Sequence, residues 1–238
     1  MIGVSKVTKH FDEVQALAEV NLDIATGEFI SIVGPSGCGK STLLRIIADL
    51  VSTKGNITKP DKGAFVFQDS ALLPWRTVQG NVELLMELEG TENKRSKAAV
   101  ALKQVGLNGF ERSYPHQLSG GMKMRLSLAR SLVLDPEYIL LDEPLSAVDE
   151  LTREVLQEEL YGMWTRDKFT AILVTHNIAE AVYLSNRVVV MSPRPGKITD
   201  IVNIGSALGF KKRTPELRTT PQFSEVVNEI AGKLRTWK

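Results

Sequence analysis

The chain has 238 residues, of which 43% are hydrophobic and 24% are charged, a composition typical of a soluble globular protein with one large core or two closely joined subdomains. Its 29 basic and 28 acidic residues leave a formal net charge of +1, which excludes a whole-molecule field that would attract nucleic acid or an anionic membrane. The single cysteine, Cys38, excludes an intrachain disulfide and agrees with a reducing compartment.

The sequence predicts neither a membrane span nor a secretory signal. Apolar runs such as "AILV" at 171–174 and "VVVM" at 188–191 have only the length of strands, far below the roughly 18 residues of a span. The first residues, "MIGVSKVTKHFDEV", lack the apolar centre of a secretory signal. We therefore expect the chain to stay in the cytoplasm.

In chain order, the first apolar segments are "IGVSKVTKHF" (2–11) and "ALAEVNLDI" (16–24), which alternate with polar residues and predict an antiparallel edge. Five later runs are apolar without alternation, as strands covered on both faces must be. Helical patterns separate most of them, which predicts an α/β fold with a mainly parallel sheet. The five runs are "EFISIVG" (28–34), "AFVFQ" (64–68), "YILLDEP" (138–144), "AILVTH" (171–176) and "RVVVM" (187–191).

Between Leu72 and Pro136 there is little strand pattern, and three segments carry helical periodicity instead. They predict a helical subdomain inserted into the sheet domain. The three segments are "VQGNVELLMELEG" (78–90), "KRSKAAVALKQVG" (94–106) and "SGGMKMRLSLARSLVL" (119–134).

After Gly205 the sequence becomes basic and loop-like, and we expect the "GFKKR" stretch (209–213) to be solvated. A last helix is predicted to begin at Thr220 and Pro221, a capping residue followed by proline. Its apolar positions share one face. They are Phe223, Val226, Val227, Ile230 and Leu234.

A glycine-rich loop follows the strand "FISIV" and precedes the helical stretch "STLLRIIADL". Gly34 to Ser41 fits the pattern G-x-x-x-x-G-K-S/T of a phosphate-binding loop. Backbone N–H groups of such a loop curl around an anion, and the helix N-terminus adds its positive dipole end. We expect Lys40 to meet the β- and γ-phosphates and Ser41 to bind Mg²⁺. The expected nucleotide contacts are Gly34, Pro35, Ser36, Gly37, Cys38, Gly39, Lys40, Ser41 and Thr42.

The alternative is a glycine-rich turn that only joins a strand to a helix. A bare turn has no use for Lys-Ser at that spacing, so the phosphate-binding interpretation is preferred. Cys38 is interpreted as a small loop residue whose backbone N–H matters, with a redox role as its alternative.

The strand "YILLDEP" ends in Asp142 and Glu143, where α/β sheets present groups to ligands. Asp142 suits Mg²⁺, and Glu143 is placed to act as general base on the attacking water. The alternative is an exposed acidic pair that opens a turn at Pro144. The phosphate loop elsewhere in the chain makes the catalytic interpretation the stronger one.

"LSGGM" at 118–122, placed before "ILLDEP", completes a set of motifs by which the chain resembles the nucleotide-binding subunit of an ATP-binding cassette (ABC) transporter. The resemblance runs from about Val4 to Ile198. In order, the motifs are Walker A "GPSGCGKS", the Q-loop residue Gln68, the signature "LSGGM", Walker B "ILLDEP", the D-loop "SAVD" ending at Asp149 and the switch histidine His176.

The resemblance implies an α/β P-loop NTPase of the ABC type, with a mainly parallel sheet, an antiparallel edge subdomain and an inserted helical subdomain. It implies an ATPase domain over 1–205, with the helical subdomain at about 72–136. Residues 206–238 would form a C-terminal extension with a terminal helix.

The resemblance also implies that the signature residues Ser119, Gly120 and Gly121 close over ATP held by the phosphate loop of a second subunit. A chain with one copy of each motif would then work as a dimer, most simply a homodimer, with two composite sites. Taken alone, "SGG" is more often a plain helix cap.

Three further residues gain roles from the resemblance. Phe11 would stack on adenine, although stacking tolerates every base and leaves GTP possible; its alternative is a core phenylalanine. His176 would contact the γ-phosphate and orient the catalytic water. Gln68 would touch Mg²⁺ and link it to the helical subdomain. Without the resemblance, His176 and Gln68 would not indicate a catalytic or metal-binding role.

The phrases "QDSALLPWRTVQGNV", "YPHQLSGGM" and "VVVMSPRPGKI" resemble the importer branch for nitrate, alkanesulfonate or taurine-like solutes. This implies a peripheral protein on the cytoplasmic face of the cell membrane, two permease subunits and an extracytoplasmic solute-binding protein. Leu72 to Trp75 would meet the permease's coupling helix, since exposed apolar patches mark interfaces. The alternative places Trp75 in the core of the helical subdomain.

Some positions depart from the family pattern. The stretch between the phosphate loop and Gln68 is short, which predicts a trimmed antiparallel subdomain, and Asp49 replaces an expected glycine. Met124 stands where glutamine is common, and Asn177 stands where aspartate is common. None of these changes removes a catalytic group.

Two alternatives stay open at this point. The same motor could serve an exporter or a lipid-handling complex. A cassette ATPase that acts on DNA, RNA or the ribosome is disfavoured, because the chain has one cassette and no basic stripe interleaved with aromatic residues.

Overall fold

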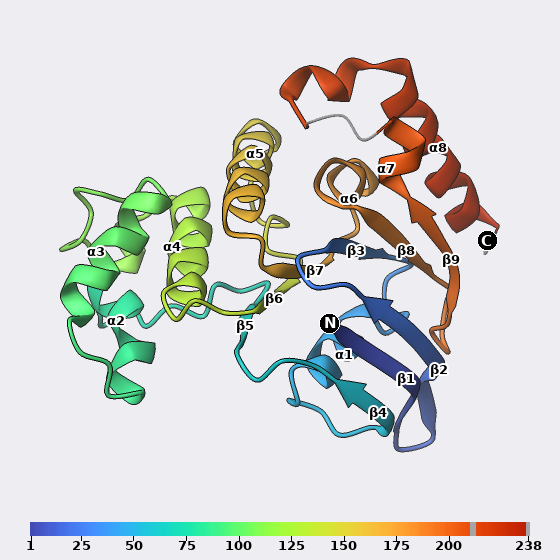
Figure 1. Cartoon of the computed structure of the whole chain (residues 1–238), viewed down its shortest axis with the longest axis horizontal. Helices are drawn as coiled ribbons and strands as arrows, with labels where there is room; N and C mark the ends of the chain where they lie inside the picture. The colour runs from blue at the N-terminus through green and yellow to red at the C-terminus, as the bar shows by residue number, and fades with distance from the viewer. Residues whose placement is uncertain (210–212, 237–238) are drawn as a thin grey trace.

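A computed structural model describes residues 1–209 and 213–236 of the chain. Its main sheet has six strands in the order β5-β6-β7-β3-β8-β9 (Figure 1). All neighbours pair in parallel except β9, which runs antiparallel to β8. The strands are β3 (Phe29–Val33), β5 (Gly63–Val66), β6 (Tyr138–Asp142), β7 (Thr170–Val174), β8 (Arg187–Met191) and β9 (Ile198–Asn203).

The predicted parallel sheet is confirmed, and its two-sided burial explains the continuous apolar runs. Along β3, Phe29 and Val33 face one hydrophobic cluster while Ile30 and Ile32 face the other. All five residues of β3 are buried. Because successive side chains of a strand point to opposite faces, a strand covered on both faces needs apolar residues at nearly every position.

The opening strands form a sheet of their own, rather than lying along the edge of the main sheet. Its order is β2-β1-β4, all antiparallel, with β1 (Ile2–Phe11), β2 (Val14–Ile24) and β4 (Lys54–Thr58). The strand β4 was not predicted, because its sequence "KGNIT" has a single apolar residue and is mostly exposed. The antiparallel edge of the main sheet is β9, which was also not predicted.

The structure shows how Asp49 fits at a position where the sequence pattern expects glycine. Its φ is 58°, a left-handed conformation that glycine adopts freely and that aspartate tolerates better than most residues. Its carboxylate also pairs with the Lys59 ammonium at 2.8 Å. The loop after the helix α1 (Lys40–Ile47) therefore keeps its turn without glycine.

The three predicted central helices are confirmed as α2 (Val78–Leu88), α3 (Lys94–Gln104) and α4 (Gly120–Leu132), with a short 3₁₀ helix η1 (Pro115–Gln117) before α4. They stand together to one side of the sheets (Figure 1). Val82, Met86 and Leu102 are fully buried between them. The N-caps Thr77 and Ser119 accept hydrogen bonds from Gly80 N–H and Met122 N–H.

Helices lie against both faces of the main sheet, among them α1 (Lys40–Ile47), α5 (Glu150–Asp167) and α6 (Ile178–Leu184). Helix α1 packs in the same cluster as the antiparallel sheet, with Leu43, Leu44 and Ile47 buried. Helices α5 and α6 contribute to the other cluster, on the opposite face of the sheet. The loops that carry the site residues emerge between these two layers.

The terminal helix is confirmed as α8 (Pro221–Arg235), capped by Thr220, whose hydroxyl accepts from Phe223 N–H at 3.3 Å. Phe223, Val226 and Ile230 are buried, and α8 packs on α6. Before it lie α7 (Ile204–Leu208) and a 3₁₀ helix η2 (Pro215–Thr219).

Two expectations for the segment after Gly205 were wrong. It begins in helix α7, whose cap Asn203 accepts from Ser206 N–H, and it is not simply loop-like. In the "GFKKR" stretch, Phe210 to Lys212 lie outside the described residues, but Arg213 is buried at 8% exposure rather than solvated. Its guanidinium donates to the carbonyl of Ser185, at the end of α6, which compensates part of the cost of burying it.

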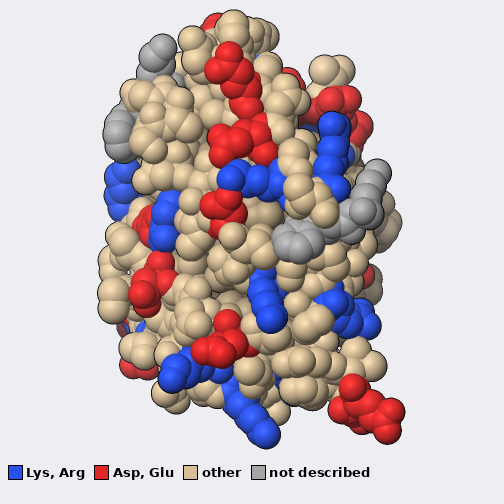
Figure 2. Space-filling view, turned by 90° about the vertical axis from the view of Figure 1, so that its right-hand side faces the viewer, with Lys and Arg blue, Asp and Glu red and all other residues tan. Residues whose placement is uncertain are grey.

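Among the helices of the described residues, none has the length and apolar character required to cross a bilayer. On the face drawn in Figure 2, basic and acidic side chains are interspersed rather than gathered by sign, in keeping with the small net charge.

Candidate functional site

The glycine-rich loop joins β3 to α1, as its sequence predicted, and two of its glycines are required by the backbone. Gly37 and Gly39 have φ values of 73° and 106°, where side chains with a Cβ are strained. A Cβ on Gly39 would also lie 2.6 Å from Leu17 of β2. The loop can therefore take this curved path only with glycine at these positions.

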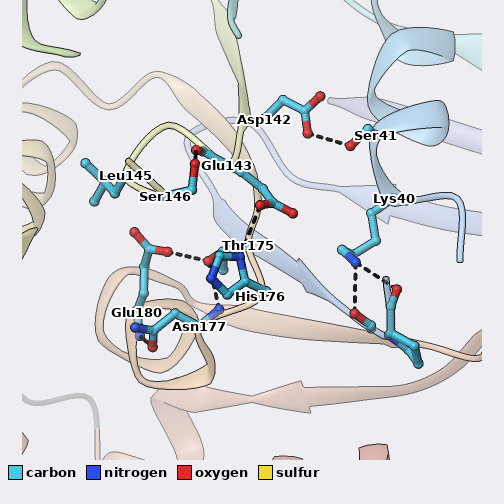
Figure 3. Close-up of polar contacts among 12 residues, drawn as sticks. Lys40, Ser41, Asp142, Glu143, Leu145, Ser146, Thr175, His176, Asn177 and Glu180 are labelled. Atoms are coloured by element: carbon cyan, nitrogen blue, oxygen red, sulfur yellow. Dashed lines mark hydrogen bonds and ion pairs between the residues drawn. The ribbon is translucent and has the colours of Figure 1, made fainter. Parts of the chain in front are cut away.

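Lys40 is the first residue of α1, and its side chain turns back into the loop (Figure 3). Its Nζ donates to the carbonyls of Gly34 at 2.8 Å and Pro35 at 3.0 Å. The residue is only 6% exposed, and an ammonium so enclosed requires such acceptors. The positive charge is thus held at the centre of the loop.

Ser41 and Asp142 meet across the two elements that carry them. The Ser41 hydroxyl donates to the Asp142 carboxylate at 2.7 Å, and Asp142 is 3% exposed at the carboxyl end of β6 (Figure 3). The Arg45 guanidinium lies 3.9 Å from the same carboxylate. Walker A and Walker B are thereby joined by a direct hydrogen bond.

Glu143 and His176 lie side by side at the ends of neighbouring strands. The His176 Nδ1 is 3.1 Å from the Glu143 carboxylate (Figure 3). Glu143 has a φ of 46°, an uncommon value for a residue with a side chain and one often found at functional sites. Its N–H donates to Val174 at 2.9 Å, which fixes the turn that aims the carboxylate.

The Glu143 side chain is 21% exposed and the His176 side chain is 61% exposed. A carboxylate that is partly shielded yet reachable by water can accept a proton from it, and an imidazole in contact with it can orient it. The two side chains belong to the predicted catalytic set, and the structure brings them together.

Behind His176, three residues support its turn. Thr175 accepts a hydrogen bond from Asn177 N–H at 3.0 Å, and its hydroxyl donates to the Glu180 carboxyl. Asn177 caps α6 by accepting from Glu180 N–H at 3.0 Å, which any short polar side chain at a cap can do. This is why asparagine serves where aspartate was expected.

Glu180 was not predicted, and its carboxyl is buried just behind the site. It is 4% exposed, its Oε1 has no hydrogen-bond partner in the structure, and burial raises its pKa. The spacing of Asn177 and Glu180 matches that of a helix capping box, the one sequence signal that pointed to it.

We expect Glu180→Ala to lower kcat for ATP hydrolysis several-fold and to destabilise the fold by about 1–3 kcal/mol, because the Thr175 hydroxyl loses its buried acceptor. Glu180→Gln, whose amide oxygen still accepts from Thr175, should retain most of the kcat and most of the stability. Steady-state ATPase kinetics and thermal unfolding measure the two effects. A Glu180→Ala variant with wild-type kcat would contradict this role.

Phe11 lines a cavity of about 540 Å³ together with the phosphate loop. Its side chain is 47% exposed, so the interpretation as a core phenylalanine is excluded. The Lys9 ammonium lies 4.8 Å from the ring centroid, a distance of cation–π attraction. The cavity is also lined by Asp12, Val14, Ala16, Ser36, Gly37, Gly39, Lys40, Ser41, Thr42, Glu143 and Arg194.

Gln68 and the signature segment face a second cavity, of about 680 Å³, rather than the first. Gln68 is exposed, and it lines this cavity together with the buried Asp142 and with Gly120 and Met124. The chain therefore does not bring Ser119, Gly120 or Gly121 to the lining of its own phosphate-loop cavity.

Within the signature, Ser119 acts as the N-cap of α4, while Gly121 is buried. A Cβ on Gly121 would lie 2.9 Å from Thr152 of α5, so close packing of α4 on α5 requires glycine here. Ser119 and Gly120 remain exposed and free to meet a second molecule. A helix N-terminus with exposed N–H groups suits a phosphate.

Cys38 is 1% exposed, and burial raises its pKa. Thiol reactivity needs an accessible thiolate, which burial disfavours. These observations favour the interpretation of Cys38 as a small loop residue over a redox role. Its backbone N–H donates to the Pro35 carbonyl at 3.3 Å.

Trp75 is 72% exposed, so it does not belong to the core of the helical subdomain. It follows Leu72, Leu73 and Pro74 in a loop held by Arg130, which donates to the carbonyls of Ser70 and Ala71, both at 2.8 Å.

The family model described as "ABC transporter" matches residues 17–146. An uncharacterised ABC transporter ATP-binding protein of Methanocaldococcus jannaschii is 45% identical, over 98% of this chain and 91% of its own length. The aliphatic sulfonates import ATP-binding protein SsuB of Bacillus cereus is 40% identical, over 96% of this chain and 94% of its own length.

Two solved structures are also similar. The dimeric structure of the bacterial ABC transporter cassette MJ0796 has a TM-score of 0.76 at 34% identity. The match covers 86% of this chain and 99% of that one. A second structure of that cassette, in a post-hydrolysis state bound to ADP and Pi, has a TM-score of 0.75 at the same identity.

Proposed function

The chain belongs to the ATP-binding proteins of ABC transporters, and we propose that it powers the import of a small anionic solute through a membrane permease. It binds and hydrolyses ATP. The solute class we propose is the sulfonate, nitrate or taurine kind. The observation that carries this choice is the likeness to a protein named for aliphatic sulfonate import, across nearly the whole of both chains.

Phe11 is proposed to stack on the adenine at one end of the 540 Å³ cavity, with the triphosphate on the loop at the other. The Lys40 ammonium then leaves the carbonyls of Gly34 and Pro35 for the β- and γ-phosphates. Backbone N–H groups of the loop, Pro35 excepted because proline has none, supply the remaining donors. Charge neutralisation by positioned donors is the main catalytic term in phosphoryl transfer.

The residues present fit Mg²⁺, which prefers oxygen ligands and shares its coordination with phosphates and water. The Ser41 hydroxyl and the Asp142 carboxylate lie 2.7 Å apart, and Gln68 shares a cavity with Asp142. Among residues 1–209 and 213–236, no group of three or more His, Cys, Asp or Glu side chains is arranged to hold a metal ion without other ligands. Ser41, Gln68 and Asp142, the last through water, would hold the ion, which neutralises phosphate charge when bound.

Glu143 is proposed as the general base that removes a proton from the attacking water. Its contact with the His176 Nδ1, at 3.1 Å, supports a shared task in which His176 orients that water toward the γ-phosphate. Thr175, Asn177 and Glu180 keep the histidine in place. The hydrolysis step needs no covalent intermediate, because the protein acts by positioning and electrostatics.

We propose that two copies of the chain form two composite ATP sites. The exposed Ser119 and Gly120 of one copy would cover ATP on the phosphate loop of the other. Two observations support this: the signature lies on a different cavity from the phosphate loop of its own chain, and the similar cassette MJ0796 is a dimer.

The permease would dock where Leu72, Leu73, Pro74 and Trp75 lie, on the cytoplasmic face of the membrane, and an extracytoplasmic binding protein would deliver the solute. Beside this segment is a hollow of about 530 Å³, which is rimmed by charged residues such as Asp61, Lys62, Glu89 and Arg130 and also has an apolar lining. It lies between β5 and the helices α2 and α4. Its apolar lining includes Phe65, Phe67, Ala71, Leu84, Leu85 and Leu134.

We expect Trp75→Ala to lower solute uptake by roughly tenfold or more, because large exposed aromatics are frequent hot spots of interfaces. The measurement is ATP-driven uptake of an alkanesulfonate into proteoliposomes that contain the permease and its binding protein. Hydrolysis by the isolated chain should not change. Val100→Ala, an exposed apolar residue of α3, is the matched control and should transport normally.

Normal uptake by Trp75→Ala would contradict the docking proposal. Efflux of solute in place of uptake would favour the exporter alternative instead, and hydrolysis that no permease stimulates would favour the non-transport alternative.

A further inference from the structure

The segment "SPRPGK" (192–197), between β8 and β9, has no role in the function derived so far. It is a turn with a fixed internal structure. The Ser192 hydroxyl accepts from Lys197 N–H at 3.1 Å, and Ser192 N–H donates to the Lys197 carbonyl at 2.9 Å. Ser192 is 8% exposed. Two bonds across the neck of the turn restrict its motion relative to the sheet.

The turn is bonded to β2, the partner strand of β1. Gly196 N–H donates to the Ala16 carbonyl at 2.9 Å, and Ala18 N–H donates to the Gly196 carbonyl at 3.0 Å. Phe11 stands at the end of β1, paired with Val14 of β2. The turn is therefore tied to the strand pair that presents the proposed adenine-stacking ring.

The same turn also presses on the phosphate loop. A Cβ on Gly196 would lie 2.0 Å from the Cys38 carbonyl oxygen, so the two backbones touch. The Arg194 guanidinium donates from Nε and Nη2 to the Gly37 carbonyl, at 3.3 and 3.2 Å. Arg194 is exposed and lines the cavity that holds Phe11 and Lys40.

These contacts place one rigid turn against both ends of the proposed nucleotide cavity. Gly37 has a φ of 73°, and its carbonyl accepts from Arg194, while the N–H of the same peptide, that of Cys38, donates to the Pro35 carbonyl at 3.3 Å. A peptide bonded at both its carbonyl and its N–H is restrained from rotating, so the curved path of the loop and its backbone donors are fixed. Preorganised donors of this kind bind an anion without first losing conformational entropy.

We propose that the Ser192–Lys197 turn is a positioning element of the ATP site, and that Arg194 holds the phosphate loop in its binding shape through the Gly37 carbonyl. This inference rests on the proposed nucleotide site. Arg194 acts on the protein backbone and not on a phosphate, so ATP and ADP should depend on it equally.

The test is binding of the fluorescent nucleotides mant-ATP and mant-ADP, with Mg²⁺, to the full chain. For Arg194→Ala we expect both dissociation constants to rise about fivefold, the effect of losing roughly one hydrogen bond to a charged donor at an exposed site. KM for ATP should rise by a similar factor with kcat unchanged. Arg194→Lys keeps one charged donor, so its dissociation constants should lie between those of the wild type and those of Arg194→Ala.

Lys197→Ala is the matched control, because it removes one positive charge from the same turn at an exposed position. Its nucleotide affinities should equal those of the wild type. Gly196→Ala, which must displace the turn from Cys38, should weaken both nucleotides further, and circular dichroism establishes whether that variant folds.

Unchanged affinities in Arg194→Ala would overturn the inference and leave the site itself standing. A loss for mant-ATP alone would overturn it too, because it would mean contact with the γ-phosphate. A lower kcat at constant affinity would overturn it as well, because it would assign Arg194 to the hydrolysis step and not to nucleotide binding. Failure of the wild-type chain to bind either nucleotide would overturn both this inference and the proposed site.

Discussion

Glu143→Gln is expected to lower phosphate release from MgATP by about 100-fold to 1,000-fold, within the range that general-base catalysis contributes. The amide keeps the size of the side chain and its neighbour His176 at 3.1 Å, but it cannot accept a proton from water. ATP binding should persist, because Glu143 is not among the loop groups that hold the phosphates. Steady-state phosphate release, with mant-ATP titration alongside, measures both.

Glu137→Gln is the control for this prediction. Glu137 is exposed just before β6, at the end of the strand opposite Glu143, so its change removes one carboxylate without touching the site. It should hydrolyse ATP at the wild-type rate. Hydrolysis by Glu143→Gln at the rate of this control would show that another group is the base.

Lys40→Met should abolish stabilisation of the chain by MgATP. The ammonium is the one positive charge at the centre of the phosphate loop, 2.8 Å from Gly34 and 3.0 Å from Pro35, and methionine fills similar space without a charge. Losing charge-assisted hydrogen bonds to phosphate should weaken ATP binding by about 100-fold or more.

Differential scanning fluorimetry with and without MgATP measures this effect. The wild-type midpoint should rise, because a ligand at 100 times its Kd adds about 2.7 kcal/mol to stability, whereas the midpoint of the variant should not move. A variant that is already unfolded without nucleotide is distinguished by its circular dichroism. An equal rise in both proteins would contradict the role of Lys40.

The structural features that the sequence predicted correctly are those that depend on residues close together in the chain. The place of the glycine-rich loop between a strand and a helix could be predicted because its glycines, Lys40 and Ser41 follow an apolar run and precede a helical one. The end of β6 could be predicted for the same reason, because Asp142 and Glu143 directly follow a short apolar run. Local patterns of this kind determine local structure, and parallel strands then bring their ends together.

The features that were missed depend on contacts between distant segments. Arg194 reaches Gly37 across 157 positions of sequence, and no pattern around "PRPGK" marks such a contact. The buried Arg213 stands in a basic stretch that suggests solvent exposure, yet its partner is the Ser185 carbonyl of another element. The strand β4 carries a single apolar residue, and the apolar residues of β9 do not alternate with polar ones, so periodicity reveals neither strand.

In the proposed composite site, two copies of this chain share each ATP between the phosphate loop of one and the signature segment of the other. Light scattering on Glu143→Gln, which should trap ATP, tests it most directly. With MgATP we expect a particle of twice the 26.3 kDa chain mass, which Ser119→Arg should prevent by blocking the signature. A particle that stays at 26.3 kDa while mant-ATP titration shows a saturated site would contradict the composite site.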